Sequence, residues 1–303
     1  MTESGSIAAT DKDIIKGPDG KPRHGIFKRM RGALSFLLAS KTATVGFILV
    51  FFWVFVAIFA PFLTRYTPFE QDYQHVNTGP STKHLLGTDD VGRDLWARIA
   101  FGARITLTLA PLSVLCALII GTTFGLVAGY FGGLVDEIVM RVLDAMMAFP
   151  RILLYLIIIA ALGPSALNIV IAIMVAGIPG IARLVRSMTL DIRTRDYVAA
   201  AILRGEHPLY IMFVEILPNA RGPIIVDAML RVGYAIFSIG TLGFLGLGLV
   251  PPTPEWGSMV ERGHTYIFTN PWSALWPSLA ISSLVVGLNL FADGLREETM
   301  RYQ

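Results

Sequence analysis

The chain has 303 residues, of which 54% are hydrophobic and only 16% are charged. This composition is too apolar for an ordinary soluble enzyme and predicts an all-α, polytopic membrane protein. The net charge of +3 is small and the basic residues form no aromatic-interleaved stripe, so we expect no nucleic-acid partner. Five scattered histidines and the single cysteine, Cys116, predict neither a metal-ligand cluster nor a disulfide framework.

Residues 1–43 are predicted to form a cytosolic N-terminal tail and an interfacial segment. The tail is polar and becomes basic near its end, and it lacks the short apolar core and cleavage site of a secretory signal. Residues 44–104 are predicted to contain the first membrane span, at 44–64, followed by an outer loop. This span has about the 20 apolar residues that a bilayer crossing requires.

Residues 105–296 are predicted to form a five-helix core, with spans at 105–130, 137–161, 167–189, 223–248 and 275–294. Each of the six predicted spans is long enough to cross the bilayer as a helix. Basic residues gather in the N-terminal tail and in the loop 190–222 between spans four and five. The positive-inside rule places both segments in the cytosol, and with six spans both termini are then cytosolic, including the C-terminal tail 297–303.

Glycines mark two places where helices are expected to approach closely. The second span contains glycines at every fourth position, which predicts a packing seam: Gly121, Gly125, Gly129 and Gly133. The fifth span ends in a second run, Gly240, Gly243, Gly246 and Gly248, for which a hinge and close packing both remain open. Beyond it, Trp256 and Trp272 are typical of the membrane-water boundary.

Three charged residues inside the predicted spans are candidates for a translocation path: Arg151, Asp227 and Arg231. Each costs about 2.5 to 3.5 kcal/mol at a helix centre and needs a polar neighbour. Asp227 and Arg231 are four residues apart and can pair on one helix face, so a structural ion pair is as well supported as a substrate contact. Arg151 has no such partner in its own helix, so snorkelling and lining the path both remain open.

The chain contains no GxxxxGK[ST] motif, so it is not a nucleotide motor of that type. The hydrolase motifs GxSxG and HExxH are absent as well, and we expect no enzyme activity. The energy for transport must therefore come from a partner ATPase or from an ion gradient.

Residues 195–219 form a polar, arginine-bearing segment in which two short helical stretches are predicted. Ala199 to Ala201 keep one helix face thin enough to enter a groove on another protein, Gly205 ends the helix, and Pro208 begins the next. The candidate contact residues of this segment are Asp196, Tyr197, Ala199, Ala200, Ala201, Gly205, Glu206 and Pro218.

Four further segments accompany it, at residues 84–94 (HLLGTDDVGRD), 129–150, 244–257 and 289–296 (NLFADGLR). In this order and spacing, the chain resembles over residues 30–300 the second permease subunit of the dipeptide, oligopeptide and nickel ABC importers. The resemblance implies the ABC type I importer permease fold, with residues 195–219 as the coupling loop that docks on an ATPase. The family usually has a glutamate where this chain has Ala199, so Asp196 or Glu206 would have to supply an ionic contact there.

The resemblance also implies the partners: a second homologous permease, two ATPase subunits that bind the ATP and Mg, an extracytoplasmic solute-binding protein, and the lipid bilayer of the bacterial inner membrane. This chain itself would bind no cofactor. Peptides are the expected substrate, and nickel chelates, glutathione, opines and oligosaccharides are the alternatives within the family. An ion-coupled secondary transporter and a receptor without transport are the hypotheses from other classes, although we find no internal repeat to favour the former.

Overall fold

The computed structural model describes residues 41–301, and within this range the regular secondary structure is helical, with two isolated β-bridges in the loops. The predicted tail, residues 1–40, and the last two residues lie outside the described part. Five helices are long and apolar enough to cross a membrane, or six if one bent pair is counted as a span. They are α2 (Lys41–Leu63), α3 (Leu95–Phe131), α6 (Ala166–Arg193), the continuous helix α8–η1–α9 (Pro208–Phe244) and α11 (Trp272–Arg301). The prediction of an all-α, polytopic membrane protein is confirmed.

The span predicted at 137–161 is not one straight helix. It consists of α4 (Gly133–Met147) and α5 (Arg151–Leu162), which are bent by 86° relative to each other. Pro150 causes the break, because a proline disfavours helical geometry in the residue before it, here Phe149. At 1.5 Å per residue, neither helix alone spans a hydrocarbon core about 30 Å thick.

The second span begins ten residues earlier than the predicted position 105, at Leu95. Asp94 caps this helix, since its carboxylate accepts a hydrogen bond from the backbone N–H of Ala97 at 2.8 Å. The preceding loop therefore comprises residues 64–94 rather than 65–104. The cap lies inside the 84–94 motif, so the motif sets where the helix starts.

The predicted glycine seam is the contact between α3 and α6. A Cβ atom added to Gly121, Gly125 or Gly129 would lie 2.8, 2.6 or 2.7 Å from atoms of α6. The two backbones therefore approach closely only because these side chains are absent. Gly133 does not belong to the seam: it is the first residue of α4, with a φ of +52°, and a Cβ added to it would have no atom within 4 Å.

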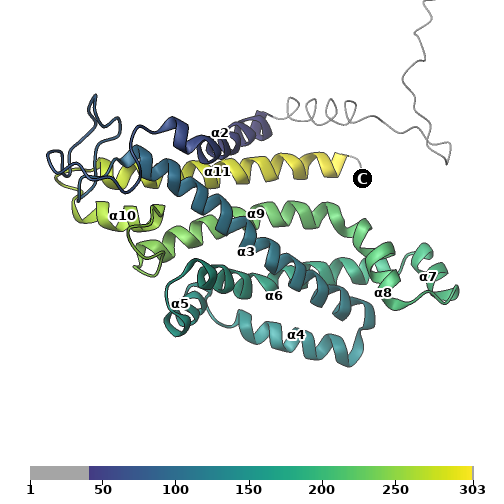
Figure 1. Ribbon diagram of the computed structural model, residues 1–303. Helices are drawn as coiled ribbons and strands as arrows, with labels where there is room; N and C mark the ends of the chain where they lie inside the picture. Colours follow the sequence, from purple (N-terminus) through teal and green to yellow (C-terminus); the bar gives the residue numbers. More distant parts are fainter. Residues whose placement is uncertain (1–40, 302–303) are drawn as a thin grey trace, which may run out of the picture.

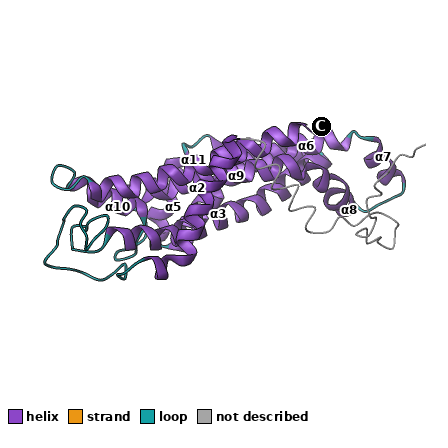
Figure 2. Ribbon diagram, turned by 90° about the horizontal axis from the view of Figure 1, so that it is seen from above, coloured by secondary structure: helices purple, strands orange, loops and turns teal. Residues whose placement is uncertain are grey.

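The long helices lie roughly along one axis, and the bundle has two distinct ends (Figures 1 and 2). The loop end is formed by residues 64–94 and α10 (Trp256–Thr265). The α7 end carries α7 (Asp196–Leu203) at the opposite extreme. Two groups of buried apolar residues fill the interior, one reaching the loop end through Trp256 and one reaching the α7 end through Val198.

Candidate functional site

Helix α7 is a short, separate element between two long helices. Helix α6 ends at Arg193, and Thr194 and Arg195 turn the chain into α7. Asp196 lies in the first turn of α7, where its negative charge favours the N-terminal end of the helix dipole. Only one of the two expected short stretches is separate, because the second, α8 (Pro208–Tyr210), continues directly into the following span.

One face of α7 is anchored on η1 (Ile211–Ile216). Val198 and Ala201 are fully buried and belong to the same apolar group as Ile211, Met212 and Ile216. Ala199 and Ala200 are exposed, so two of the three small residues point away from this contact and the third packs into it. The small-residue face predicted from the sequence is therefore divided between an anchoring side and an open side.

Gly205 and Pro208 form the turn that returns the chain to the bundle. Gly205 has a φ of +74°, a left-handed conformation that side chains disfavour, although an added Cβ would meet no atom within 4 Å. Pro208 is in the first turn of the next helix, as predicted. Glu206 lies 3.5 Å from the guanidinium of Arg204, so its charge already has a partner inside the chain.

Pro218 lies just after η1, where the helix widens to π-type pairing. The backbone N–H of Leu217 bonds to the carbonyl of Met212 instead of the usual residue four positions back. A proline has no N–H to donate, and its ring collides with the carbonyl four residues earlier, which a locally wider helix relieves. Pro218 thus shapes the helix that connects α7 to the interior of the bundle.

The open side of this end carries exposed apolar side chains. Leu203 is 89% exposed. Its large apolar neighbours with more than a third of their surface exposed are Tyr197, Ile202, Leu209, Tyr210, Phe213 and Val214. Clustered exposed apolar surface of this kind is typical of a contact with another protein or with lipid.

A cavity of about 450 Å³ lies between α3, α5, α6 and α9 (Leu217–Phe244). It is lined mainly by apolar side chains, with the polar groups of Tyr155, Tyr234 and Ser238 on its wall. Arg151, Asp227 and Arg231, which the sequence predicts as path candidates, all line it. The fold therefore brings together in one cavity residues that are up to 80 positions apart.

The three charged residues of the cavity differ in their pairing. Asp227 and Arg231 form the ion pair expected from their spacing, and Arg231 also lies against Gly180 of α6. Arg151 is exposed in the chain by itself, and within residues 41–301 its side chain makes no ion pair. Arg151 is therefore the charged residue of this cavity that has no ion pair within the described part of the chain.

Two ion pairs fasten the bent element to α6. The Nε and Nη2 atoms of Arg186 each donate a hydrogen bond to one carboxylate oxygen of Asp136, at 2.5 Å. Arg183 lies 2.5 Å from Asp144. These pairs hold α4 along the same helix that carries the glycine seam.

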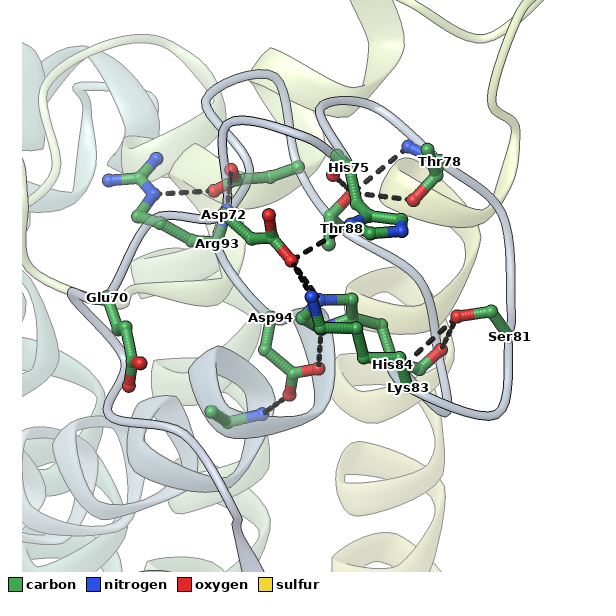
Figure 3. Close-up of polar contacts among 12 residues, drawn as sticks. Glu70, Asp72, His75, Thr78, Ser81, Lys83, His84, Thr88, Arg93 and Asp94 are labelled. Carbon is green, nitrogen blue, oxygen red and sulfur yellow. Dashed lines mark hydrogen bonds and ion pairs between the residues drawn. The ribbon is translucent and has the colours of Figure 1, made fainter.

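The 84–94 motif folds the loop end (Figure 3). His84 is buried, and its Nδ1 lies 2.9 Å from the capping carboxylate of Asp94. Asp89 accepts hydrogen bonds from Arg93 at 2.7 Å through Nε and at 2.9 Å through the backbone N–H. The resemblance identified the motif, but its spacing did not reveal these pairs, because they depend on turns at Gly87 and Gly92, whose φ angles are +90° and +80°.

The sequence predicted no metal-ligand cluster, yet this loop brings Asp72, His75 and His84 together, with one ligand atom from each within 4.8 Å of the others. The Lys83 ammonium lies 2.6 Å from Asp72 and is the main reason that the pKa of this carboxyl is well below its usual value. The same contact raises the pKa of Lys83. An electrostatic cluster therefore stands at the loop end, opposite to α7.

Glu255 and Trp256 close the loop end against the bundle. Glu255 is fully buried and accepts hydrogen bonds from the backbone N–H groups of Gly257 and Ser258 at 2.7 and 2.8 Å, while burial raises its pKa. Gly243 and Gly248 leave room for this carboxyl, which favours close packing over a hinge. Trp256 is 1% exposed and donates to the carbonyl of Ile99, so it packs inside the chain and does not face lipid.

The long apolar helices, the bent span and the interior cavity define a polytopic membrane protein with a candidate solute path. A profile of the binding-protein-dependent transport system inner membrane component family matches residues 121–297. A second profile, the N-terminal transmembrane domain of oligopeptide transport permease C, matches residues 29–80. The chain therefore belongs to the family of binding-protein-dependent inner-membrane permeases of ABC transport systems, as the resemblance predicted.

Individual relatives match this chain over most of their length. The chain is 44% identical over 267 residues to the dipeptide transport system permease protein DppC of Alkalihalophilus pseudofirmus, and the match covers 88% of each chain. It is 38% identical to DppC of Haemophilus influenzae, over 89% of this chain and 90% of that one. It is 40% identical to the glutathione transport system permease protein GsiD of Pectobacterium atrosepticum, over 86% of this chain and 87% of that one.

Proposed function

We propose that this chain forms half of the translocation path of an ATP-driven peptide importer and receives the motion of its motor through α7. The observation that carries the proposal is the position of α7, which is anchored on one face and exposes apolar side chains at one extreme of the bundle. A permease without a nucleotide motif needs such a contact to receive work from another protein.

The complete importer would contain a second homologous permease, two ATPase subunits that bind ATP and Mg, and an extracytoplasmic binding protein. In this arrangement the α7 end is cytosolic and the loop end faces the binding protein. Helix α2 begins and α11 ends on the side of the bundle toward α7, which is consistent with cytosolic termini (Figure 1). The exposed Tyr197, Ala199, Ala200 and Asp196 would contact the ATPase, while Ala201, Gly205 and Pro218 shape the element.

The 450 Å³ cavity would be this chain's share of the path. Its apolar wall with a few polar groups suits a solute that carries both side chains and backbone amides. Arg151 would attract the negatively charged end of the solute, whereas the Asp227–Arg231 pair would present a neutral, hydrogen-bonding surface. Closing and opening of the path would follow from movement of η1 and α9, since α7 rests on the former.

Peptides are the proposed substrate because dipeptide permeases are among the most similar relatives. Glutathione is the second candidate, supported by the similarly close GsiD. Nickel chelates, opines and oligosaccharides stay within the reach of the resemblance but have no such support here.

The test is to purify the tagged chain from its native membrane and to identify stoichiometric partners by mass spectrometry. The recovered complex is then reconstituted into proteoliposomes, and ATP-dependent uptake of a labelled dipeptide is measured, with glutathione as the competing solute. Recovery of a second permease and ATPases together with ATP-dependent uptake would support the proposal. Recovery of the chain alone, with uptake that needs an ion gradient instead of ATP, would overturn it.

A further inference from the structure

His84 is the starting point, because both of its ring nitrogens face carboxylates. Its Nδ1 lies 2.9 Å from Asp94, and its Nε2 lies 3.4 Å from Asp72 (Figure 3). An ionised carboxylate can only accept hydrogen bonds, so Nδ1 must carry the proton donated to Asp94. Its Nε2 points toward the Asp72 carboxylate, so a metal ion placed between the two could bind Nε2 and leave the hydrogen bond from Nδ1 to Asp94 intact.

Asp72 and His75 complete a set of three potential ligands around this point. The Nδ1 atom of His75 lies 2.9 Å from the same oxygen of Asp72 that faces His84. In a tetrahedral zinc site with bonds of about 2.0 to 2.1 Å, neighbouring ligand atoms are roughly 3.3 Å apart. The observed separations of 2.9 and 3.4 Å from the Asp72 oxygen bracket this value.

The position of Asp94 behind His84 is the arrangement found behind many metal-binding histidines. A carboxylate that accepts from the far ring nitrogen fixes the tautomer and the ring orientation, and makes the other nitrogen a better ligand. Here the histidine side chain is 2% exposed and Asp94 is 5% exposed, so the pair is rigidly placed. Asp94 is itself held by its cap bond to Ala97.

Lys83 holds the cation position in this structure. Its ammonium lies 2.6 Å from Asp72, but its side chain is 47% exposed and can turn into solvent. A hollow of about 470 Å³, lined by Tyr66, Glu70 and Lys83 among others, opens in front of the cluster. The hollow gives a metal ion a route of entry and leaves room for a water molecule as the fourth ligand.

We propose that Asp72, His75 and His84 bind a divalent transition-metal ion of the zinc class, with Asp94 as the carboxylate that orients His84. Two imidazoles and one carboxylate suit Zn²⁺, whereas Ca²⁺ and Mg²⁺ prefer oxygen ligands alone. The ion would join residues 72–75 to the turn that precedes α3 and would displace Lys83 from Asp72. Metal binding would therefore stiffen the loop end without touching the cavity.

The experiment measures Zn²⁺ itself on the full chain in lipid nanodiscs at neutral pH. Equilibrium dialysis against buffered Zn²⁺ gives the stoichiometry and affinity, and Co²⁺ substitution reports tetrahedral ligation through its visible absorption. We expect one ion per chain. His75→Ala and Asp72→Asn should each weaken binding at least about tenfold, because each removes a direct ligand. His75 is partly exposed, so its removal is not expected to unfold the loop.

Two variants give opposite and diagnostic shifts. Asp94→Asn keeps a good helix cap but loses the orienting charge, so the affinity for Zn²⁺ should fall about tenfold to a hundredfold. Lys83→Gln removes the competing ammonium, so the affinity should rise. His264→Ala, on α10 at the same end, is the matched control and should change nothing. Absence of Zn²⁺ binding, or binding that neither His75→Ala nor Asp72→Asn weakens, would overturn the proposal and leave His84 as a purely structural hydrogen-bonding residue.

Discussion

The loop end and the α7 end of the bundle differ in how their side chains are paired. At the loop end, His84, Asp89, Arg93, Asp94 and Arg98 are each at most 8% exposed, and each has a polar partner inside the chain. At the α7 end the ion pairs of the arginines are exposed, and large apolar side chains such as Leu203 face outward. The loop end pairs its buried charged residues with one another, although Nη2 of Arg93 and Nε of Arg98 make no hydrogen bond there. The α7 end instead presents surface that burial by a partner would stabilise.

The largest effect is expected from Asp89→Ala, which tests whether the loop end is self-sufficient. The carboxylate lies 2.7 Å from Arg93 and 3.4 Å from Arg98, and both arginines are almost fully buried. Removing it leaves Arg98 without its ion pair and Arg93 with only the Asp90 carboxylate at 3.9 Å, which should cost about 3 kcal/mol of stability. Thermal unfolding of the purified chain in nanodiscs should show a Tm lower by several degrees.

Glu70→Ala is the control for this substitution, because Glu70 lies in the same loop but is exposed. Its effect on stability should stay within about 0.5 kcal/mol. A wild-type Tm for Asp89→Ala would show that the paired network does not hold the loop end together.

The second-largest effect is expected from Ala200→Arg, at the α7 end. Ala200 is exposed, so a long side chain fits the isolated chain and the Tm should not change. A docked ATPase would meet that side chain, and ATP-driven uptake should fall at least about tenfold, equivalent to about 1.4 kcal/mol. Thermal unfolding measures the Tm, and uptake into proteoliposomes measures transport, with the assembly of the complex checked by size-exclusion chromatography. Ala200→Ser keeps the surface thin and should transport normally; undiminished uptake by an assembled Ala200→Arg complex would argue that α7 does not couple.

A smaller effect is expected from Arg151→Gln, which tests the cavity between the two ends. Because Arg151 has no ion pair within the described residues, its loss should not change the Tm. Uptake of a dipeptide with a free carboxylate should fall about threefold to tenfold, since one charge-assisted hydrogen bond is lost. Uptake of the same dipeptide with an amidated C-terminus should be unaffected, and Arg151→Lys should retain most activity. Equal losses for both peptides would mean that Arg151 does not contact the carboxylate.

The same comparison explains which features could be predicted from the sequence. The long spans follow from apolar runs, and the ion pair of Asp227 and Arg231 follows from helical spacing, because both signals are local. The break at Pro150 was missed because apolar residues predominate on both sides of it, although α4 also carries charged residues such as Glu137, Arg141 and Asp144. Hydropathy does not report a change in the direction of a helix, so only the structure reveals the bend.

The loop end was the least predictable part for a related reason. His84 is 12 positions from Asp72 and 10 from Asp94, without any period, and two glycines with positive φ angles bring the three residues together. Trp256 is a second example: tryptophan is a residue type typical of a membrane boundary, but the chain buries this one against α3. Side-chain pairing across irregular turns depends on the whole loop, so spacing alone carries no signal for it.

The smallest expected effect is a pH dependence at the loop end that comes from Glu255. Burial raises the pKa of this carboxyl above its ordinary value of 4.5, so the folded chain holds the proton more tightly than the unfolded chain does. The stability that this provides is complete below pH 4.5 and is lost as the pH rises through the folded pKa. Glu255→Gln cannot ionise, so its Tm does not follow this titration. The amount by which the Tm of the wild type exceeds that of the variant should therefore shrink, by a few degrees or less, as the pH rises toward neutral.

The measurement is the Tm of both proteins across this pH range, and the comparison of the two removes the titration of all other groups. Glu261→Gln, an exposed position on the same helix, should give a difference that does not vary with pH. A wild-type advantage that grows with pH would mean that the backbone N–H groups of Gly257 and Ser258 favour the ionised carboxylate more than burial disfavours it. In that case the loop end would be stabilised by a buried charge at this position too, as it is at Asp89.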